Sequence, residues 1–102
     1  MNKRSLIEQV AVRHDGNAIM YAMDPCEELC LLAVKENGRA LHCIKNKTYE
    51  MCYEAVKNDG LSLMYVPSKY KTFELCIAAV TQNGLALQFV PSEAGILEKV
   101  AN

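Results

Sequence analysis

Cysteine and histidine are the residue types in this chain that could supply nucleophilic or metal-binding chemistry. The 102 residues include five cysteines and two histidines. Cys26 and Cys30 stand four residues apart, a spacing that brings two thiols to one side of a helix, and His42 directly precedes Cys43. A zinc site, or a thiolate with an adjacent base, needs several such groups to converge. The spacing therefore raises two hypotheses, a metal site and a thiol nucleophile.

The wider pattern favours neither hypothesis. The cysteines lack the paired spacing of zinc-binding motifs. His42 and Cys43 are adjacent, so their side chains are expected to diverge on a helix, and His14 is expected at a helix end. We therefore predict no catalytic residue, no metal site and no cofactor, and keep a thiol- or metal-dependent enzyme as an alternative. Three cysteines occupy the same position of a repeated sequence motif, namely Cys30, Cys52 and Cys76. Small buried thiols at such a position suit close helix packing.

The helices that position these residues are expected from a sequence motif that recurs every 22 to 24 residues and ends with glycine. Alanine stands five residues before each glycine, valine four residues before it, and an apolar residue nine residues before it. A fixed period of this length is typical of repeat proteins, in which each unit buries its apolar face against its neighbours. The four glycines are Gly16, Gly38, Gly60 and Gly84.

The unit that closes on Gly84 shows how each repeat is expected to fold. Thr72 is a good N-cap, and Gly84 is expected to end the helix as a left-handed C-cap. Residues 85–90 are expected to form a short second helix, with Leu87 on its packed side, that a proline stops. In the second unit the expected N-cap is Asp24, which a proline follows. The apolar stripe of the fourth unit is Leu75, Cys76, Ala79 and Val80.

We therefore predict a single all-α domain over residues 1–102, made of stacked short helix-turn-helix repeats in a solenoid-like arrangement without strands. The longer helices are expected near residues 4–15, 25–37, 48–59 and 72–83. The units are expected at about residues 4–24, 25–45, 46–70 and 71–93, followed by a capping half-repeat at 94–102.

Residues 71–91 contain the most complete copy of the motif, which reads Thr, Glu-Leu-Cys, Ala-Val, Asn-Gly, Ala-Leu and Val-Pro in this order. The motif resembles the short helical repeat known as domain of unknown function 4116, and the resemblance covers about residues 24–93. Arg4 and Glu8 depart from it, because threonine and cysteine are typical at their places. The resemblance implies a helical fold and brings no catalytic residue. Such repeats occur in host-associated bacteria, protists and large viruses, which implies a role in interaction or host manipulation.

The composition narrows the classes of partner. A formal net charge of −1 argues against a nucleic-acid binder, which needs a basic surface. The longest apolar runs are about five residues, whereas a membrane-spanning helix needs about 20. The odd number of cysteines argues against an oxidised secreted domain. We therefore expect a cytoplasmic protein that binds neither nucleic acid nor membranes.

A non-enzymatic protein-interaction module is the function that these features favour. A small viral or bacterial effector that occludes a host or defence protein is the first alternative. The partner is expected to be another protein, and the half-repeat at 94–102 would either cap the stack or form a homodimer through a two-fold contact. The candidate interaction surface consists of aromatic and apolar residues at recurring repeat positions and in the half-repeat: Tyr53, Met64, Tyr65, Ile77, Phe89, Leu97 and Val100.

Overall fold

Short α-helices alternate with 3-10 helices along the chain. The computed structural model describes residues 3–91, and within that range it contains no strand. The predicted all-helical fold is confirmed, and the four α-helices lie where the sequence predicts them. None of the helices in this range is long and apolar enough to cross a membrane. In chain order the elements are α1 (Lys3–His14), η1 (Gly16–Tyr21), α2 (Glu27–Glu36), η2 (Gly38–Cys43), α3 (Tyr49–Asn58), η3 (Gly60–Tyr65), η4 (Ser68–Tyr70), α4 (Phe73–Gln82) and η5 (Gly84–Phe89).

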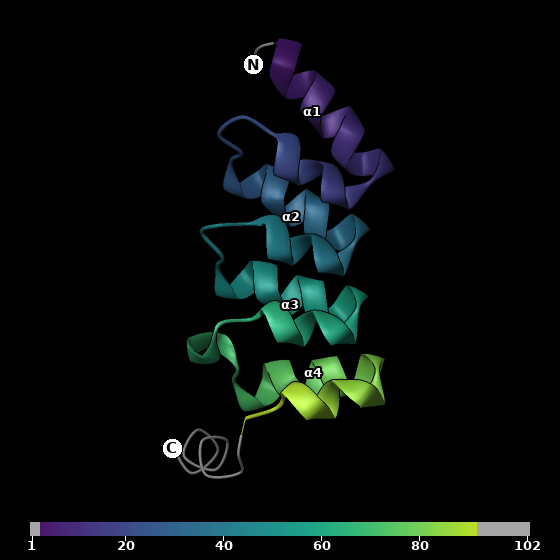
Figure 1. Ribbon diagram of the computed structural model, residues 1–102, viewed down its shortest axis with the longest axis vertical. Helices are drawn as coiled ribbons and strands as arrows, with labels where there is room; N and C mark the ends of the chain where they lie inside the picture. Colours follow the sequence, from purple (N-terminus) through teal and green to yellow (C-terminus); the bar gives the residue numbers. More distant parts are fainter. Residues whose placement is uncertain (1–2, 92–102) are drawn as a thin grey trace.

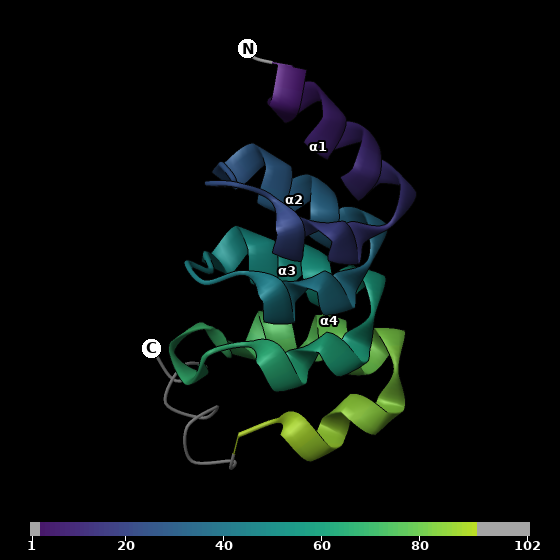
Figure 2. The same cartoon turned by 45° about the horizontal axis from the view of Figure 1, so that its top comes forward.

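The helices form two layers along the long axis of the molecule. Each α-helix packs on the 3-10 helix that follows it, and the resulting pairs succeed one another from the N-terminal to the C-terminal end (Figure 1). Consecutive α-helices contact each other, and so do the 3-10 helices η1, η2, η3 and η5 (Figure 2). The principal extents are 49 × 23 × 14 Å. Each pair of helices thus packs against the pairs that precede and follow it.

Threonine side chains begin two of the α-helices, as the sequence predicts. Thr48 Oγ1 accepts a hydrogen bond from Met51 N, and Thr72 Oγ1 accepts one from Leu75 N, both at 3.2 Å. The prediction for α2 was wrong, because its N-cap is Cys26, whose side chain makes no capping hydrogen bond. Asp24 lies in the preceding loop with a φ of 53° and does not cap the helix.

The turn inside each unit also differs from the prediction. Gly84 does not end α4 as a left-handed cap, because it is the first residue of η5 and no described glycine has a positive φ. The residue before each glycine ends the α-helix in an extended conformation, and its side-chain oxygen accepts the N–H two residues later. In the fourth unit this bond joins Leu85 N to Asn83 Oδ1 at 2.9 Å. An aspartate or asparagine thus supplies the cap that the prediction assigned to the glycine. The four capping residues are Asp15, Asn37, Asp59 and Asn83.

The glycines are required by close approach between units. A Cβ placed on Gly38 would lie 2.3 Å from the carbonyl oxygen of Ala55, and one on Gly60 would lie 2.2 Å from that of Ala79. Gly16 meets the next unit in the same way. The repeated alanine and the repeated glycine are therefore the two sides of one contact, in which the 3-10 helix of one unit touches the α-helix of the next.

The core runs through the whole described stack. It is made of columns of residues from equivalent repeat positions, of which valine and leucine contribute the largest fully buried side chains. Val80 and Leu87 in the fourth unit are exceptions, since Val80 is half-buried and Leu87 is exposed. Leu87 was expected on the packed side of its helix, and this prediction was wrong. The buried columns include Val12, Val34 and Val56, then Leu41 and Leu63, then Ala40, Ser62 and Ala86.

Ser62 places a hydroxyl where the equivalent units have alanine. The side chain is fully buried, and its Oγ has no hydrogen-bond partner among residues 3–91. A buried hydroxyl without a partner costs free energy, so we expect Ser62→Ala to raise the free energy of unfolding by about 1 kcal/mol in urea denaturation. The reverse change, Ala40→Ser, is the matched control and should lower it by a similar amount. A lower stability of Ser62→Ala would contradict the assignment.

Candidate functional site

A groove between α1 and α2 lies at the place where the first unit departs from the repeat. Its volume is about 820 Å³, and Arg4 and Glu8 contribute to its lining. Arg4 Nε donates to Glu8 Oε2 at 2.9 Å, and the backbone N–H of Met23 donates to the same oxygen at 2.8 Å. Arg4 Nη2 also donates to the carbonyl oxygen of Tyr21 at 3.1 Å. Arg4 and Glu8, the two residues that depart from the repeat, therefore fix the loop that follows η1.

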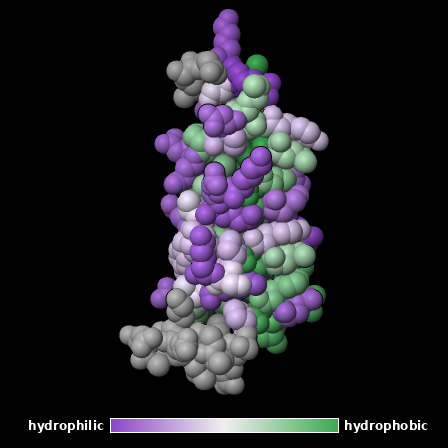
Figure 3. Space-filling view, turned by 60° about the vertical axis from the view of Figure 1, so that its left-hand side comes forward, coloured by the Kyte–Doolittle hydropathy of each residue, from purple (hydrophilic) through white to green (hydrophobic). Residues whose placement is uncertain are grey.

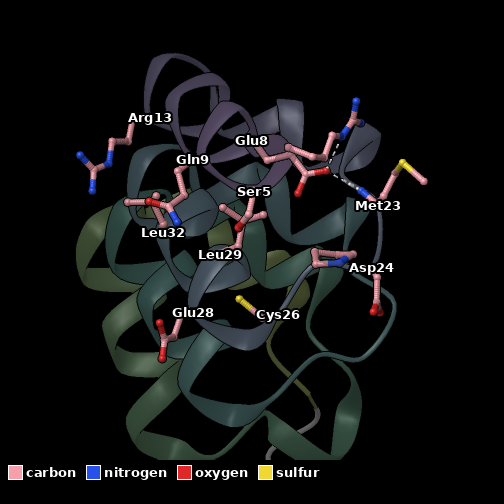
Figure 4. Close-up of a pocket in the computed structure, with 12 residues that line it drawn as sticks. Ser5, Glu8, Gln9, Arg13, Met23, Asp24, Cys26, Glu28, Leu29 and Leu32 are labelled. Atoms are coloured by element: carbon pink, nitrogen blue, oxygen red, sulfur yellow. Dashed lines mark hydrogen bonds and ion pairs between the residues drawn. The ribbon is translucent and has the colours of Figure 1, made fainter. Parts of the chain in front are cut away.

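The electrostatics of this groove are those of a structural contact. The N–H of Met23 and, next, the Arg4 guanidinium hold the pKa of the Glu8 carboxyl below its usual value. Figure 4 shows Glu8 joined to Met23, whereas Arg13 and Glu28 extend away from this pair. Apart from the Arg4–Glu8 pair, the charged groups that line the groove thus do not converge on one point, as a catalytic carboxylate or anion site would require.

The three cysteines of the repeated position are buried, as the packing interpretation expects. Burial raises the pKa of the Cys30 and Cys76 thiols, and it raises the pKa of Cys52 to about 11. A thiol with a raised pKa holds little of the reactive thiolate at neutral pH. Across residues 3–91, no group of three or more histidine, cysteine, aspartate or glutamate side chains is placed to hold a metal ion.

His42 and Cys43 lie in contact, which corrects the prediction that their side chains diverge. Cys43 Sγ is 3.4 Å from Nε2 and 3.7 Å from Nδ1 of His42. These similar distances place the sulfur beside both nitrogens, not in line with the lone pair of one. His42 Nδ1 lies 2.6 Å from the carbonyl oxygen of Arg39, and burial raises the pKa of the Cys43 thiol. The pair therefore has the contact of a nucleophile and a base, but not the lowered thiol pKa that activation requires.

These surroundings predict how the thiols react. Cys26 is exposed and should react first with a thiol reagent at pH 8, while Cys30, Cys52 and Cys76 should react slowly until denaturant is added. Because burial raises the pKa of Cys52 to about 11 and the thiolate is the reacting form, the folded chain offers little reactive Cys52 at pH 8, and denaturant should speed its labelling. Mass spectrometry of the labelled cysteines gives each rate. Fast native labelling of Cys52 would contradict its burial.

A ridge of methionine and aromatic side chains runs along the layer of 3-10 helices. Met20 and Met64 occupy the same repeat position and are 56% and 52% exposed, and the neighbouring Tyr21 is 73% exposed. His42 occupies the same repeat position on η2, and its ring lies 5.3 Å from that of Tyr65 at a tilt of 36°. We call these five residues the methionine ridge. Figure 3 shows hydrophobic residues gathered along one long edge of the molecule, beside a largely hydrophilic face.

The predicted surface residues are divided between the two layers. Met64 and Tyr65 lie on η3, in the methionine ridge, and Phe89 lies half-buried on η5. Tyr53 and Ile77 lie instead in the α layer, on α3 and α4.

Tyr53 has local partners of its own in the α layer. Its ring centroid is 6.1 Å from that of Tyr49, and Lys57 Nζ is 5.4 Å from its centroid. Leu97 and Val100 lie outside the described residues. Met20 and Tyr21 were missing from the predicted surface, although their repeat positions are those of Met64 and Tyr65.

The described residues thus define an all-helical domain of alternating α- and 3-10 helices, with an apolar ridge on one layer. Residues 48–93 match the family model described as a domain of unknown function (DUF4116). The resemblance that the sequence indicates from about residue 24 is therefore confirmed from residue 48 onward. No similarity to a curated protein or to a solved structure was found.

Proposed function

We propose that this chain is a short solenoid that binds another protein, without catalysis, through the methionine ridge. The observation that carries the proposal is the exposure of Met20 and Met64 at one repeat position, beside the exposed Tyr21. Apolar side chains that gather on a surface commonly mark an interface, and methionine adapts its shape to different partners. The recurrence of one α/3-10 pair along the long axis supports the solenoid arrangement.

The spacing of the ridge suggests the form of the partner. Packed helices lie about 8–10 Å apart, so equivalent residues of successive units are separated by about this distance. In an α-helix, residues seven apart are separated by about 10.5 Å along the axis. The partner segment that fits best is an amphipathic helix with an apolar residue at every seventh position, lying along the 3-10 layer.

A reducing compartment such as the cytoplasm suits this function. All five cysteines are free, and three of them are buried where a disulfide would disturb the packing of the units. We therefore place the interaction in the cytoplasm of the producing cell, or of a host cell.

A capture experiment with paired variants tests the ridge. Met20→Ser/Met64→Ser should weaken retention of the partner from lysate by about tenfold or more, since two hot-spot side chains of about 1 kcal/mol each are lost. Ile77→Ser is the matched control, because it removes an equally exposed apolar side chain from the α layer. A protein retained equally by all three forms, or lost only with Ile77→Ser, would contradict binding at the ridge.

A further inference from the structure

The α1 end of the stack exposes residues that the other units bury. Ile7 is 63% exposed, whereas the residues at the same repeat position of α2, α3 and α4 are buried. Ala11 is also exposed, whereas its equivalents in these helices are fully buried. Because α1 lies at one end of the long axis, no unit precedes it among the described residues (Figure 1). The buried equivalents are Leu29, Met51 and Leu75 for Ile7, and Ala33, Ala55 and Ala79 for Ala11.

The opposite end of the stack exposes the other side of the same contact, on η5. Leu87 is 67% exposed, whereas Leu41 and Leu63 at the same repeat position are fully buried. No described atom lies within 4 Å of a Cβ placed on Gly84, whereas each earlier repeat glycine lies against an alanine carbonyl of the next α-helix. The two ends of the described stack thus each carry one half of the contact that joins successive units (Figure 2).

The contact between η2 and α3 shows how these two halves fit together. The carbonyl oxygen of Ala55 lies against Gly38, whose N–H donates to Asn58 Oδ1 at 2.7 Å. In α1 the repeat positions of Ala55 and Asn58 hold Ala11 and His14. A neutral histidine side chain can accept a hydrogen bond, as the asparagine oxygen does. The outer surface of α1 therefore has the groups that a repeat glycine of a preceding unit requires.

A second copy of this chain is the partner that both ends fit. Repeat proteins normally end in units with polar outer faces, which keep the stack soluble. The described ends depart from this rule, because α1 also exposes Leu6 and Val10, and η5 also exposes Leu85. Two different surfaces of one molecule that complement each other make a heterologous contact, which joins copies head to tail.

We propose that copies of this chain associate end to end, with α1 of one copy packed on α4 and η5 of the next. In this contact Ile7 lies against Leu87, and the carbonyl of Ala11 lies against Gly84, so the stack continues from one molecule into another. Each pair of copies keeps one free α1 end and one free η5 end, so short open chains grow as the concentration rises. The contact is separate from the methionine ridge and goes beyond the function proposed for it.

Sedimentation velocity of the full chain at concentrations up to about 1 mM, where even weak contacts are populated, measures this association. Ile7→Glu and Leu87→Glu should each weaken it by about tenfold or more, because the contact would bury a charge without a partner. Both residues are exposed in the single chain, so both variants should fold. Met64→Glu is the matched control, because Met64 is 52% exposed on η3, away from both ends, and this variant should associate like the native chain.

A mixture of the two end variants distinguishes this arrangement from a two-fold dimer. Ile7→Glu keeps an intact η5 end and Leu87→Glu keeps an intact α1 end, so together they should form a heterodimer that grows no further. A two-fold contact through one end would instead leave the variant of the other end associating like the native chain, and this result would overturn the proposal. A native chain that stays monomeric at every concentration, or a mixture without heterodimer, would overturn it as well.

Discussion

Leu63→Ala is expected to lower the free energy of unfolding by about 3 kcal/mol, measured by urea denaturation. Leu63 lies on η3 and is fully buried in the column that it shares with Leu41. Its loss removes favourable burial and leaves a cavity between rigid helices of neighbouring units. Because η3 contacts η2 on one side and α4 and η5 on the other, a cavity at Leu63 weakens the contacts on both sides.

Met64→Ala is the matched control for this substitution. Met64 is the next residue of the same 3-10 helix and is half exposed to solvent. Its truncation should change the free energy of unfolding by no more than about 0.5 kcal/mol, since exposed positions without special contacts tolerate substitution. Equal effects of the two variants would mean that the buried face of η3 is wrongly assigned.

The starts of α3 and α4 could be predicted from the sequence because two independent signals agree at each of them. Thr48 and Thr72 are N-caps, and apolar residues follow at helical spacing. The α2 start could not be predicted, because Asp24 precedes a proline in a typical capping order but lies in the loop with a positive φ. The backbone of this connection, which takes a positive φ at Asp24, thus overrides the local capping signal.

The role of the glycines could not be read from the sequence for a different reason. An Asn-Gly or Asp-Gly pair after a helix is typical of a left-handed C-cap and equally of a point of close approach. The period of the repeat was a further signal, since Ala33 and Ala55 each follow the glycine of the preceding unit by 17 residues. Only the geometry of neighbouring units shows that the Ala55 carbonyl lies against Gly38.

The candidate surface could be predicted only in part. The repeat positions of Met64 and Tyr65 were recognised, and the same positions in the first unit hold Met20 and Tyr21. Tyr53 illustrates the limit, because its repeat position does not reveal the neighbouring ring of Tyr49 or the layer on which it lies. Exposure depends on which face of a helix meets the next unit, and this is a property of the stack as a whole.

Gly60→Ala is expected to lower the free energy of unfolding by about 3 kcal/mol, at the upper end of the usual cost of overpacking. The added Cβ would lie 2.2 Å from the carbonyl oxygen of Ala79, a backbone atom that cannot move aside as a flexible side chain can. The N–H of Gly60 also donates to the side chain of Gln82, so separation of η3 from α4 breaks this hydrogen bond as well.

The same measurement separates this clash from a general effect of substitution. Thr81→Ala changes an exposed residue on the neighbouring α4 and should alter the free energy of unfolding by no more than about 0.5 kcal/mol. Gly38→Ala should resemble Gly60→Ala, because its Cβ would lie 2.3 Å from the Ala55 carbonyl oxygen. If both glycine variants unfold like the native chain, the 3-10 helix of one unit does not approach the next α-helix as closely as described. The repeated pairing of glycine with alanine would then need another cause.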